Sequence, residues 1–304
     1  MDKIGIITIT FNSANVLAGF LESIFSQTHK NFILYVIDNG SEDDTVNILK
    51  SIKDSRSKVI FNKKNLGVAR ANNIGIKKAI NDNCDQVLII NNDVEFETNL
   101  INNLLITQSK FDCSLVAPKM KYFYDKNKIW YAGSWFNSLN GFLPIHRGMN
   151  QNDSKQYDQD ELIHYAPTCC ILIKKIVFED IGYMDEKYFV YFDDVDFLYR
   201  VYKQKNHKLY YCYNVDFYHK VGSLTSSIIE NKKNIYRSDF FIKQNFRNHV
   251  YFLKKVGGIY SGIFIFLLFF KFNLRFVFST RIRKNFSTFF LINKSYFSGL
   301  FMKK

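Results

Sequence analysis

Three apolar, β-branched segments, each followed by polar residues and then by a helical pattern, constrain the fold of this chain most strongly. The segments are 4–9 (IGIITI), 32–37 (FILYVI) and 86–90 (QVLII). Such uninterrupted apolar runs are typical of strands that are buried on both faces of a sheet. Strands that alternate with helices at this spacing predict an α/β fold with a mostly parallel, doubly wound sheet flanked by helices.

The remaining elements are less regular. Apolar residues recur at helical spacing from Val16 to Phe25, and again at Val46, Leu49 and Ile52. We further expect a short strand at 58–61, a helix at 67–80, a strand and then a helix within 171–182, a helix at 196–204 and a strand at 208–218. Residues 119–165 are rich in Tyr, Asn, Asp, Trp and Gly without a clean period, so irregular structure with a few strands, of the kind that shapes a substrate pocket, is expected there.

Charge divides the chain into two unequal parts. Residues 1–200 hold 22 Lys and Arg against 25 Asp and Glu, whereas residues 201–304 hold 19 against three, a balance of +16. A basic half of this kind occurs in nucleic-acid-binding proteins and in segments that lie on anionic membranes. The five cysteines lack C-x-x-C spacing and the N-terminus lacks a signal-peptide pattern, so we expect a cytoplasmic, reducing location.

The C-terminal region favours the membrane surface over nucleic acid. Its last 54 residues carry ten basic residues and no acidic one, interleaved with Phe-rich blocks such as 286–292. The longest charge-free stretch, 256–270, is shorter than the roughly 20 apolar residues that a spanning helix needs, and Lys271 and Arg275 interrupt it. We therefore expect amphipathic helices at the inner face of the plasma membrane. The alternative is a basic helical subdomain packed on the core.

Polar residues follow each of the three buried strands. They are Thr10-Phe11-Asn12, Asp38-Asn39-Gly40-Ser41 and Asn91-Asn92-Asp93. Because ligands of open α/β sheets bind beyond the carboxyl ends of the strands, one binding edge is expected to unite these clusters. Asp38 is either a turn residue or the acceptor of a pyrimidine N–H. Asp93 is either part of a polar turn or a ligand of Mg²⁺ or Mn²⁺ that in turn holds a diphosphate.

Two further features suggest chemistry. In 188–196 (YFVYFDDVD), the carboxylates Asp193, Asp194 and Asp196 fall within four residues and are flanked by aromatic side chains. Mutual repulsion and apolar surroundings raise carboxyl pKa values toward the range of a general base. His219 ends a strand-like run and is either a structural histidine or, with Asp93, a second metal ligand.

Taken together, these segments resemble glycosyltransferase family 2, the inverting nucleotide-sugar transferases with the GT-A fold, and especially its rhamnosyltransferase and O-antigen glycosyltransferase branch. The resemblance covers about residues 3–226. It rests on ITITFNS (7–13), SIFSQTHKNFILYVIDNGSEDDT (23–45), NLGVARANNIGI (65–76), LIINNDVE (88–95), CCILIKKIVFEDIGYMDEKYFVYFDDVDFLYR (169–200) and YHKVGSLTS (218–226).

The resemblance implies a role for each matching residue. Nucleotide binding falls to Thr10, Asn12, Asp38, Asn65, Arg70 and Asn92. Asp93 corresponds to the last acid of the D-x-D metal motif, with Asn91 in place of the first, and His219 corresponds to the histidine that meets the metal or diphosphate. Asp194 corresponds to the catalytic base, with Asp193 in support.

Two departures from the family pattern bear on the acceptor. Thr168 stands where a glycine is common, on the acceptor side of the pocket. Asn248 stands where processive synthases carry the Trp of Gln-x-x-Arg-Trp, so transfer of a single sugar is expected rather than polymerisation.

The resemblance implies an inverting transferase that uses a dTDP- or UDP-linked sugar and Mg²⁺ or Mn²⁺ to build bacterial surface polysaccharide on a glycan or lipid-linked glycan. Residues 1–226 would form the catalytic domain, with a nucleotide-binding half to about 118 and an acceptor half from 119, and 227–304 the basic helical region. A metal-dependent nucleotidyltransferase and a nucleic-acid-binding protein are the alternatives.

Overall fold

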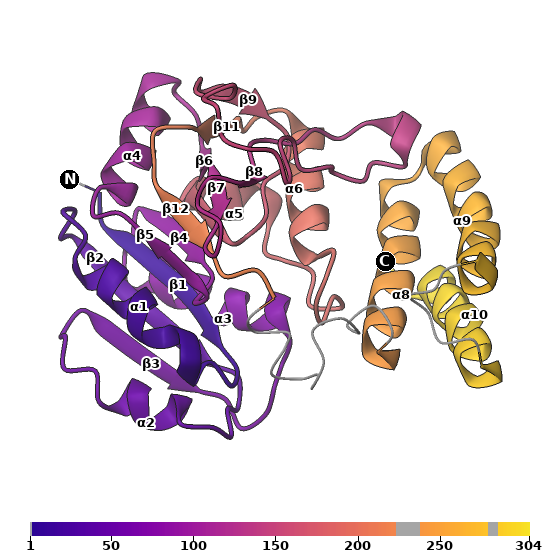
Figure 1. The fold of residues 1–304 in the computed structure, drawn as a ribbon, viewed down its shortest axis with the longest axis horizontal. Coiled ribbons are helices and arrows are strands. Elements are labelled where there is room, and N and C mark those ends of the chain that lie inside the picture. The colour runs from indigo at the N-terminus through magenta and orange to yellow at the C-terminus, as the bar shows by residue number, and fades with distance from the viewer. Residues whose placement is uncertain (1, 223–237, 279–284) are drawn as a thin grey trace.

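The computed structural model describes residues 2–222, 238–278 and 285–304, which form a sheet-centred body followed by three C-terminal helices (Figure 1). The strands of the central sheet are β1 (Ile4–Thr10), β2 (Phe32–Asp38), β3 (Ser57–Phe61), β4 (Gln86–Ile90), β6 (Leu115–Pro118), β9 (Glu161–Ile163), β10 (Cys170–Lys174) and β11 (Leu209–Cys212). They lie in the order β3-β2-β1-β4-β10-β6-β11-β9. β1 to β4 are parallel, whereas β10 runs antiparallel to both of its neighbours. The predicted α/β fold with a mostly parallel sheet is confirmed.

The helices that cover this sheet follow its strands in the expected alternation. They are α1 (Ala14–Phe25), α2 (Thr45–Lys50), α3 (Val68–Asn81), α4 (Leu100–Lys110), α5 (Lys175–Ile181) and α6 (Asp193–Gln204), with a 3-10 turn η1 at Ser138–Asn140. Helix α6 begins three residues before the predicted start at 196, so all three clustered aspartates lie in its first turn. Carboxylates are favoured there because the amino-terminal end of a helix carries partial positive charge.

A second, four-stranded sheet stands beside the first. Its strands are β5 (Val94–Phe96), β7 (Met120–Tyr122), β8 (Ile129–Tyr131) and β12 (Phe217–His219), in the order β5-β12-β7-β8. The single strand predicted at 208–218 is therefore wrong, because β11 and β12 belong to different sheets. The antiparallel register of β12 on β5 places His219 opposite Val94, next to Asp93.

The three C-terminal helices form a layer of their own, at the right of Figure 1. They are α8 (Asp239–Val256), α9 (Gly258–Phe278) and α10 (Phe286–Phe301). Helix α9 continues through Lys271 and Arg275, so these two charges interrupt the charge-free run but not the helix. By length and composition alone, the 21-residue α9 could cross a membrane, since an 18-residue window within it has a mean hydropathy of 1.7. The predicted domain boundary at 226/227 and the basic residues Arg281, Arg283 and Lys284 lie outside the described residues.

Close packing of α3 on β1 depends on glycine. An added Cβ on Gly5 would come 2.4 Å from the Cβ of Ala79 in α3, well inside van der Waals contact. The side chain of Ala79 has no rotatable bond that could move it aside, so the helix and strand would have to separate.

We predict that Gly5→Ala lowers the free energy of unfolding by about 1–3 kcal/mol because it overpacks this contact. Urea denaturation of the full chain measures the change. Gly262→Ala is the matched control: Gly262 lies inside exposed α9 with nothing within 4 Å of its added Cβ. That substitution should raise stability by about 0.5–1 kcal/mol. Equal effects of both variants would contradict the packing argument.

Candidate functional site

The polar residues that follow the buried strands meet at one edge of the central sheet. The parallel register aligns Thr10 at the end of β1 with Asp38 at the end of β2. β4, which leads into Asn91, Asn92 and Asp93, pairs with β1 on its other side. The topology thus brings together three clusters that lie far apart in sequence.

Asp38 is the buried centre of the first part of this edge. Its carboxylate accepts hydrogen bonds from the hydroxyls of Thr10 (2.8 Å) and Ser41 (2.6 Å) and from the backbone N–H groups of Gly40 and Ser41 (3.2 and 3.1 Å). Asp38 is 1% exposed. In this structure it fixes the loop after β2; a direct contact with a pyrimidine base stays a prediction.

The neighbouring loops continue this network. Asn12, with a left-handed φ of 50°, accepts a hydrogen bond from the backbone N–H of Glu42 (2.8 Å). The Asn65 side chain accepts from Gly67 N–H (2.9 Å) and from the Asn39 amide (3.2 Å). The predicted nucleotide-binding residues Thr10, Asn12, Asp38 and Asn65 therefore frame one loop cluster.

Arg70 and Asn92 stand apart from that network. Arg70 lies in α3 with a largely exposed guanidinium, 3.6 Å from the Glu186 carboxylate. Asn92 is fully enclosed, and neither atom of its amide has a hydrogen-bond partner among the described residues. The turn that carries Asn65 also touches the aromatic segment before α6, because Val68 N–H donates to Phe189 O (2.6 Å).

Asp93 and His219 form the second part of the edge. His219 Nε2 lies 3.3 Å from Asp93 Oδ1, and both side chains are buried. The sulfur of Cys169 lies 3.9 Å from each ring nitrogen of His219, and the Trp130 ring packs edge-on against the imidazole at 4.4 Å. Burial by itself lowers the pKa of His219, but the Cys169 sulfur and the Asp93 carboxylate outweigh it and hold that pKa above its usual range.

This pair fits part of a divalent-cation site. A carboxylate oxygen and a neutral imidazole are suitable ligands for Mn²⁺. Mg²⁺ and similar ions are commonly held by one or two protein groups, with substrate phosphates and water completing the octahedron. Within the described residues, no cluster of three or more His, Cys, Asp or Glu side chains is arranged to hold a metal ion. Asp93 and His219 are therefore two candidate ligands within the part of the chain that the structure describes, and cation binding would require His219 to be neutral.

The three clustered aspartates have different surroundings. Asp196, 2% exposed, is neutralised by Lys255 (2.6 Å) and Arg200 (3.1 Å). Asp193 is also buried, and burial together with the Asp194 charge raises its pKa. Asp194 is partly exposed; its Oδ2 accepts a hydrogen bond from Tyr165 OH at 2.7 Å. Burial raises the pKa of Asp194, while the Tyr165 bond opposes the rise.

Cys169 joins the two acidic parts of the site. It follows Thr168, and the Asn91 amide donates to its sulfur at 3.4 Å. Burial raises the pKa of its thiol; His219 opposes this rise, and the charges of Asp93 and Asp194 add to it. A candidate base and a candidate cation pair thus share one buried neighbour.

Sequence patterns did not single out Tyr165, Cys169 or Trp130. Tyr165 ends the irregular segment 119–165, where no period marks an inward-facing residue. Cys169 immediately precedes an apolar strand, β10, and is indistinguishable by type from its buried neighbour Cys170.

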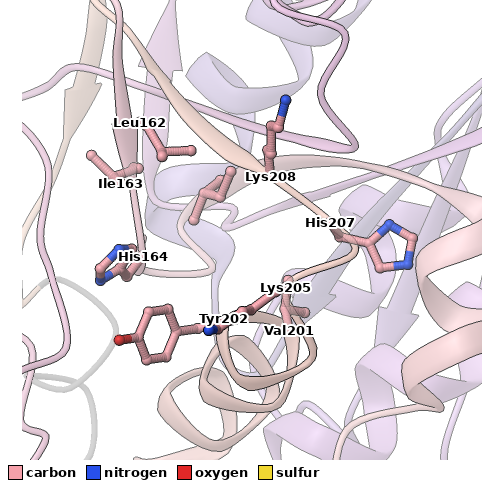
Figure 2. A pocket seen from close by; sticks show the side chains of 9 residues that line it. Leu162, Ile163, His164, Val201, Tyr202, Lys205, His207 and Lys208 are labelled. Carbon is pink, nitrogen blue, oxygen red and sulfur yellow. The ribbon is translucent and has the colours of Figure 1, made fainter.

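A separate pocket of about 260 Å³ lies between β9, β11 and the carboxyl-terminal end of α6 (Figure 2). The His164 and Tyr202 rings pack against each other there, with centroids 4.2 Å apart and planes tilted by 36°, and Lys205 and Lys208 also line the pocket. The His207 ring is already bonded to Asp180 and Ser114. None of the residues predicted from sequence lines this pocket.

Comparison with known proteins identifies a family. The family described as Glycosyl transferase family 2 matches residues 5–182, more than half of the chain. The hexosyltransferase Agl10 of low-salt glycan biosynthesis in Haloferax volcanii is 24% identical over 223 residues, which are 72% of this chain and 67% of that protein. An uncharacterized glycosyltransferase of Rickettsia felis is 27% identical over 61% of this chain, but the match spans only 32% of that protein.

A third relative is named in more detail. The Escherichia coli WfaP, a UDP-Glc:α-D-GlcNAc-diphosphoundecaprenol β-1,3-glucosyltransferase, is 38% identical over 79 residues, 26% of this chain and 32% of that protein.

Solved structures share the fold at low sequence identity. A crystal structure of S. aureus TarS has a TM-score of 0.60 and 16% identity, covering 98% of this chain and 80% of that one. GalNAc-T7 with UDP, GalNAc and Mn²⁺ has a TM-score of 0.58 and 13% identity, covering 81% of this chain and 51% of that one.

We predict that Asp93→Ala abolishes the gain in UDP affinity that Mn²⁺ provides and that His219→Ala reduces it, because each variant removes one of two ligands. Isothermal titration calorimetry of UDP with and without Mn²⁺ measures the gain. Glu97→Gln is the control, since Glu97 bonds to Asp216 N–H and the Asn103 amide away from the pair. If Mn²⁺ does not change the affinity of the wild type for UDP, the cation site is refuted.

Proposed function

The chain belongs to glycosyl transferase family 2, and we propose that it transfers a single sugar from a nucleoside-diphosphate sugar to a glycan or lipid-linked glycan, with inversion at the anomeric carbon. The observation that carries the proposal is the setting of Asp194. Its carboxylate is partly exposed, held by the Tyr165 hydroxyl, and close to the thiol that also contacts His219.

This setting suits a general base. Burial raises the pKa of Asp194 toward the range in which a carboxylate accepts protons effectively. Asp194 takes the proton of an acceptor hydroxyl as that oxygen bonds to the anomeric carbon and the bond from that carbon to the diphosphate oxygen breaks. Asp193 stays buried behind it in a supporting role, and Tyr165 fixes the orientation of the base.

The nucleotide is proposed to lie along the loops framed by Thr10, Asn12, Asp38 and Asn65, with Arg70 and Asn92 beside them. Asp93 and His219 would hold Mg²⁺ or Mn²⁺, which when bound supplies Lewis-acid stabilisation of the departing diphosphate. No enzyme nucleophile is required, because one displacement inverts the configuration.

Relatives narrow the substrates to be tested first. The Haloferax protein is named a hexosyltransferase, and the E. coli protein is named for UDP-Glc and a GlcNAc-diphosphoundecaprenol acceptor. We therefore propose a UDP-hexose as the first donor to test, dTDP-rhamnose as the second, and an undecaprenyl-diphosphate-linked sugar as the acceptor class. Release of nucleoside diphosphate rather than pyrophosphate separates this reaction from nucleotidyl transfer.

The C-terminal helices are proposed to hold the enzyme on the inner face of the membrane, where a lipid-linked acceptor resides. α9 exposes an apolar stripe that includes Phe266, Phe270 and Leu274, and Phe290 and Phe297 of α10 are exposed as well. The opposite side of α9 packs on α8, where Phe272 stacks on Phe246 at 4.0 Å. A helix bound on one side and apolar on the other suits burial in the interface.

We predict that Asp194→Asn lowers sugar transfer from the active donor about 10²-fold or more, because it keeps the shape and removes the base. The variant should still bind that donor in the presence of Mn²⁺, as measured by the thermal shift that the donor causes. Turnover close to wild type would reject Asp194 as the base.

Tyr165→Phe refines this test through the pH dependence of kcat. The Tyr165 hydrogen bond lowers the pKa of Asp194, so removing the hydroxyl raises that pKa. The base must be ionised to act, and the acidic limb of the kcat profile should therefore move to higher pH. A shift to lower pH would contradict the assignment.

We predict that Phe266→Ser combined with Phe270→Ser weakens co-sedimentation with anionic vesicles, because these rings are exposed on α9. High salt should release the wild type only in part, since the electrostatic attraction is screened and the apolar contribution is not. Phe61→Ser is the control, because it changes an exposed ring on β3 (44%, against 63% for Phe266 and 49% for Phe270). Tight binding to duplex DNA without vesicle binding would reject the membrane proposal in favour of nucleic acid.

A further inference from the structure

The turn that presents Asp194 has an unusual backbone. Tyr191 and Phe192, the two residues before α6, both adopt left-handed φ angles, 65° and 71°. Non-glycine residues rarely adopt this conformation, and consecutive examples persist only where surrounding contacts enforce it. The contacts that enforce it here come from α8, about 50 residues further along the chain.

The Asn248 side chain binds the backbone of this turn. Its amide nitrogen donates to the carbonyls of Val190 and Tyr191, both at 2.9 Å, and Asn248 is fully buried. Its amide oxygen accepts a hydrogen bond from Arg247 Nε at 2.9 Å, so the orientation of the amide is fixed. Both partners of the donating nitrogen are backbone groups of the turn itself.

Lys255 binds an aspartate in the first turn of α6. Its ammonium lies 2.6 Å from Asp196, one residue after Val195 in α6, and 2.8 Å from Asp185. Tyr188 OH also donates to Asp196, at 3.3 Å. Asp196 is thereby fixed in position as well as neutralised.

The spacing of these residues along α8 explains how one helix contacts both the turn before α6 and the first turn of α6. Asn248, Phe252 and Lys255 are related by four and seven residues, so they lie on one face of the helix. Phe252 packs on the Phe192 ring, with centroids 5.9 Å apart, and His249 stacks on that ring at 5.1 Å. This face of α8 therefore contacts the chain at 190–192, just before Asp193 and Asp194 in sequence, and at Asp196, just after them.

We propose that Asn248 and Lys255 are positioning residues for Asp194, and that α8 is a working part of the catalytic unit rather than of a separate C-terminal region. The expected loss of turnover rests on the proposed function, whereas the expected loosening of the turn before α6 does not. Asn248 occupies the position of the Trp in Gln-x-x-Arg-Trp of processive synthases, and here its side chain binds the turn itself.

The test uses the full chain with Asn248→Asp, which removes the donating nitrogen, and Lys255→Met, which removes the charge. Lys254→Met is the matched control: Lys254 is the adjacent lysine of α8, but its ammonium binds the Leu300 and Met302 carbonyls at the end of α10. Lys255→Arg is the conservative variant that should restore the ion pair.

The structural readout is amide hydrogen–deuterium exchange of residues 190–197, which needs no substrate. Exchange should accelerate in Asn248→Asp and Lys255→Met, and should remain at the wild-type rate in Lys254→Met. Unchanged exchange in both test variants, or equal acceleration in the control, would overturn the proposal even if the enzyme proves active.

The kinetic readout is sugar transfer from UDP-glucose, or from whichever donor the wild type uses. Both test variants should lower kcat on the order of 10²-fold with KM for the donor unchanged, because misplacement of a base affects the chemical step. Lys255→Arg should recover most of the rate. In an Asp194→Asn background neither substitution should lower the residual rate further, since both act through Asp194.

An additive loss in that background, or a rise in donor KM with kcat unchanged, would overturn the positioning role. A wild type that turns over no nucleotide sugar would refute the proposed function, while the exchange experiment would still decide whether α8 holds the turn.

Discussion

The cost of burying carboxylates at the end of a sheet governs the arrangement of this site. A buried charge is tolerated only when hydrogen bonds or an opposite charge replace its hydration. Hydroxyl and backbone donors do so for Asp38, His219 does so for Asp93, and cationic side chains do so for Asp196. Asp194 accepts hydrogen bonds from the Tyr165 hydroxyl and from backbone donors. Of these four carboxylates, Asp194 is the one that is partly open to solvent, and it is the one proposed to accept a proton.

Each of the two sheets positions a different part of the site. The parallel register of the central sheet brings the ends of β1, β2 and β4 to one edge, whereas the smaller sheet carries His219 to that edge through its pairing with β5. Asp93 lies in the turn between β4 of the central sheet and β5 of the smaller sheet, directly before β5 begins. Displacement of either sheet would separate the Asp93–His219 pair.

The C-terminal helices combine two kinds of surface in one layer. One face of α8 carries polar contacts to the catalytic half of the chain. Asn248 bonds to the turn before α6, and Lys255 pairs with Asp196 in the first turn of α6. α9 and α10 cover the rest of α8 and leave phenylalanines exposed on their outer side. This layer thus lies between the acidic turn and the apolar surface proposed to meet the membrane.

The sequence by itself determined the buried strands, the helices between them and the polar residues at the strand ends, because these depend on periodicity and on near neighbours. Tertiary structure alone decided which residues meet. Asp93 and His219 are paired by a strand ladder, and the neutralisation of Asp196 needs Lys255 from a distant helix. It also decided that β11 and β12 separate and that α9 runs through Lys271, since only contacts between distant segments distinguish such alternatives. The three aspartates that fall within residues 193–196 look alike in sequence; their environments differ only once the chain has folded.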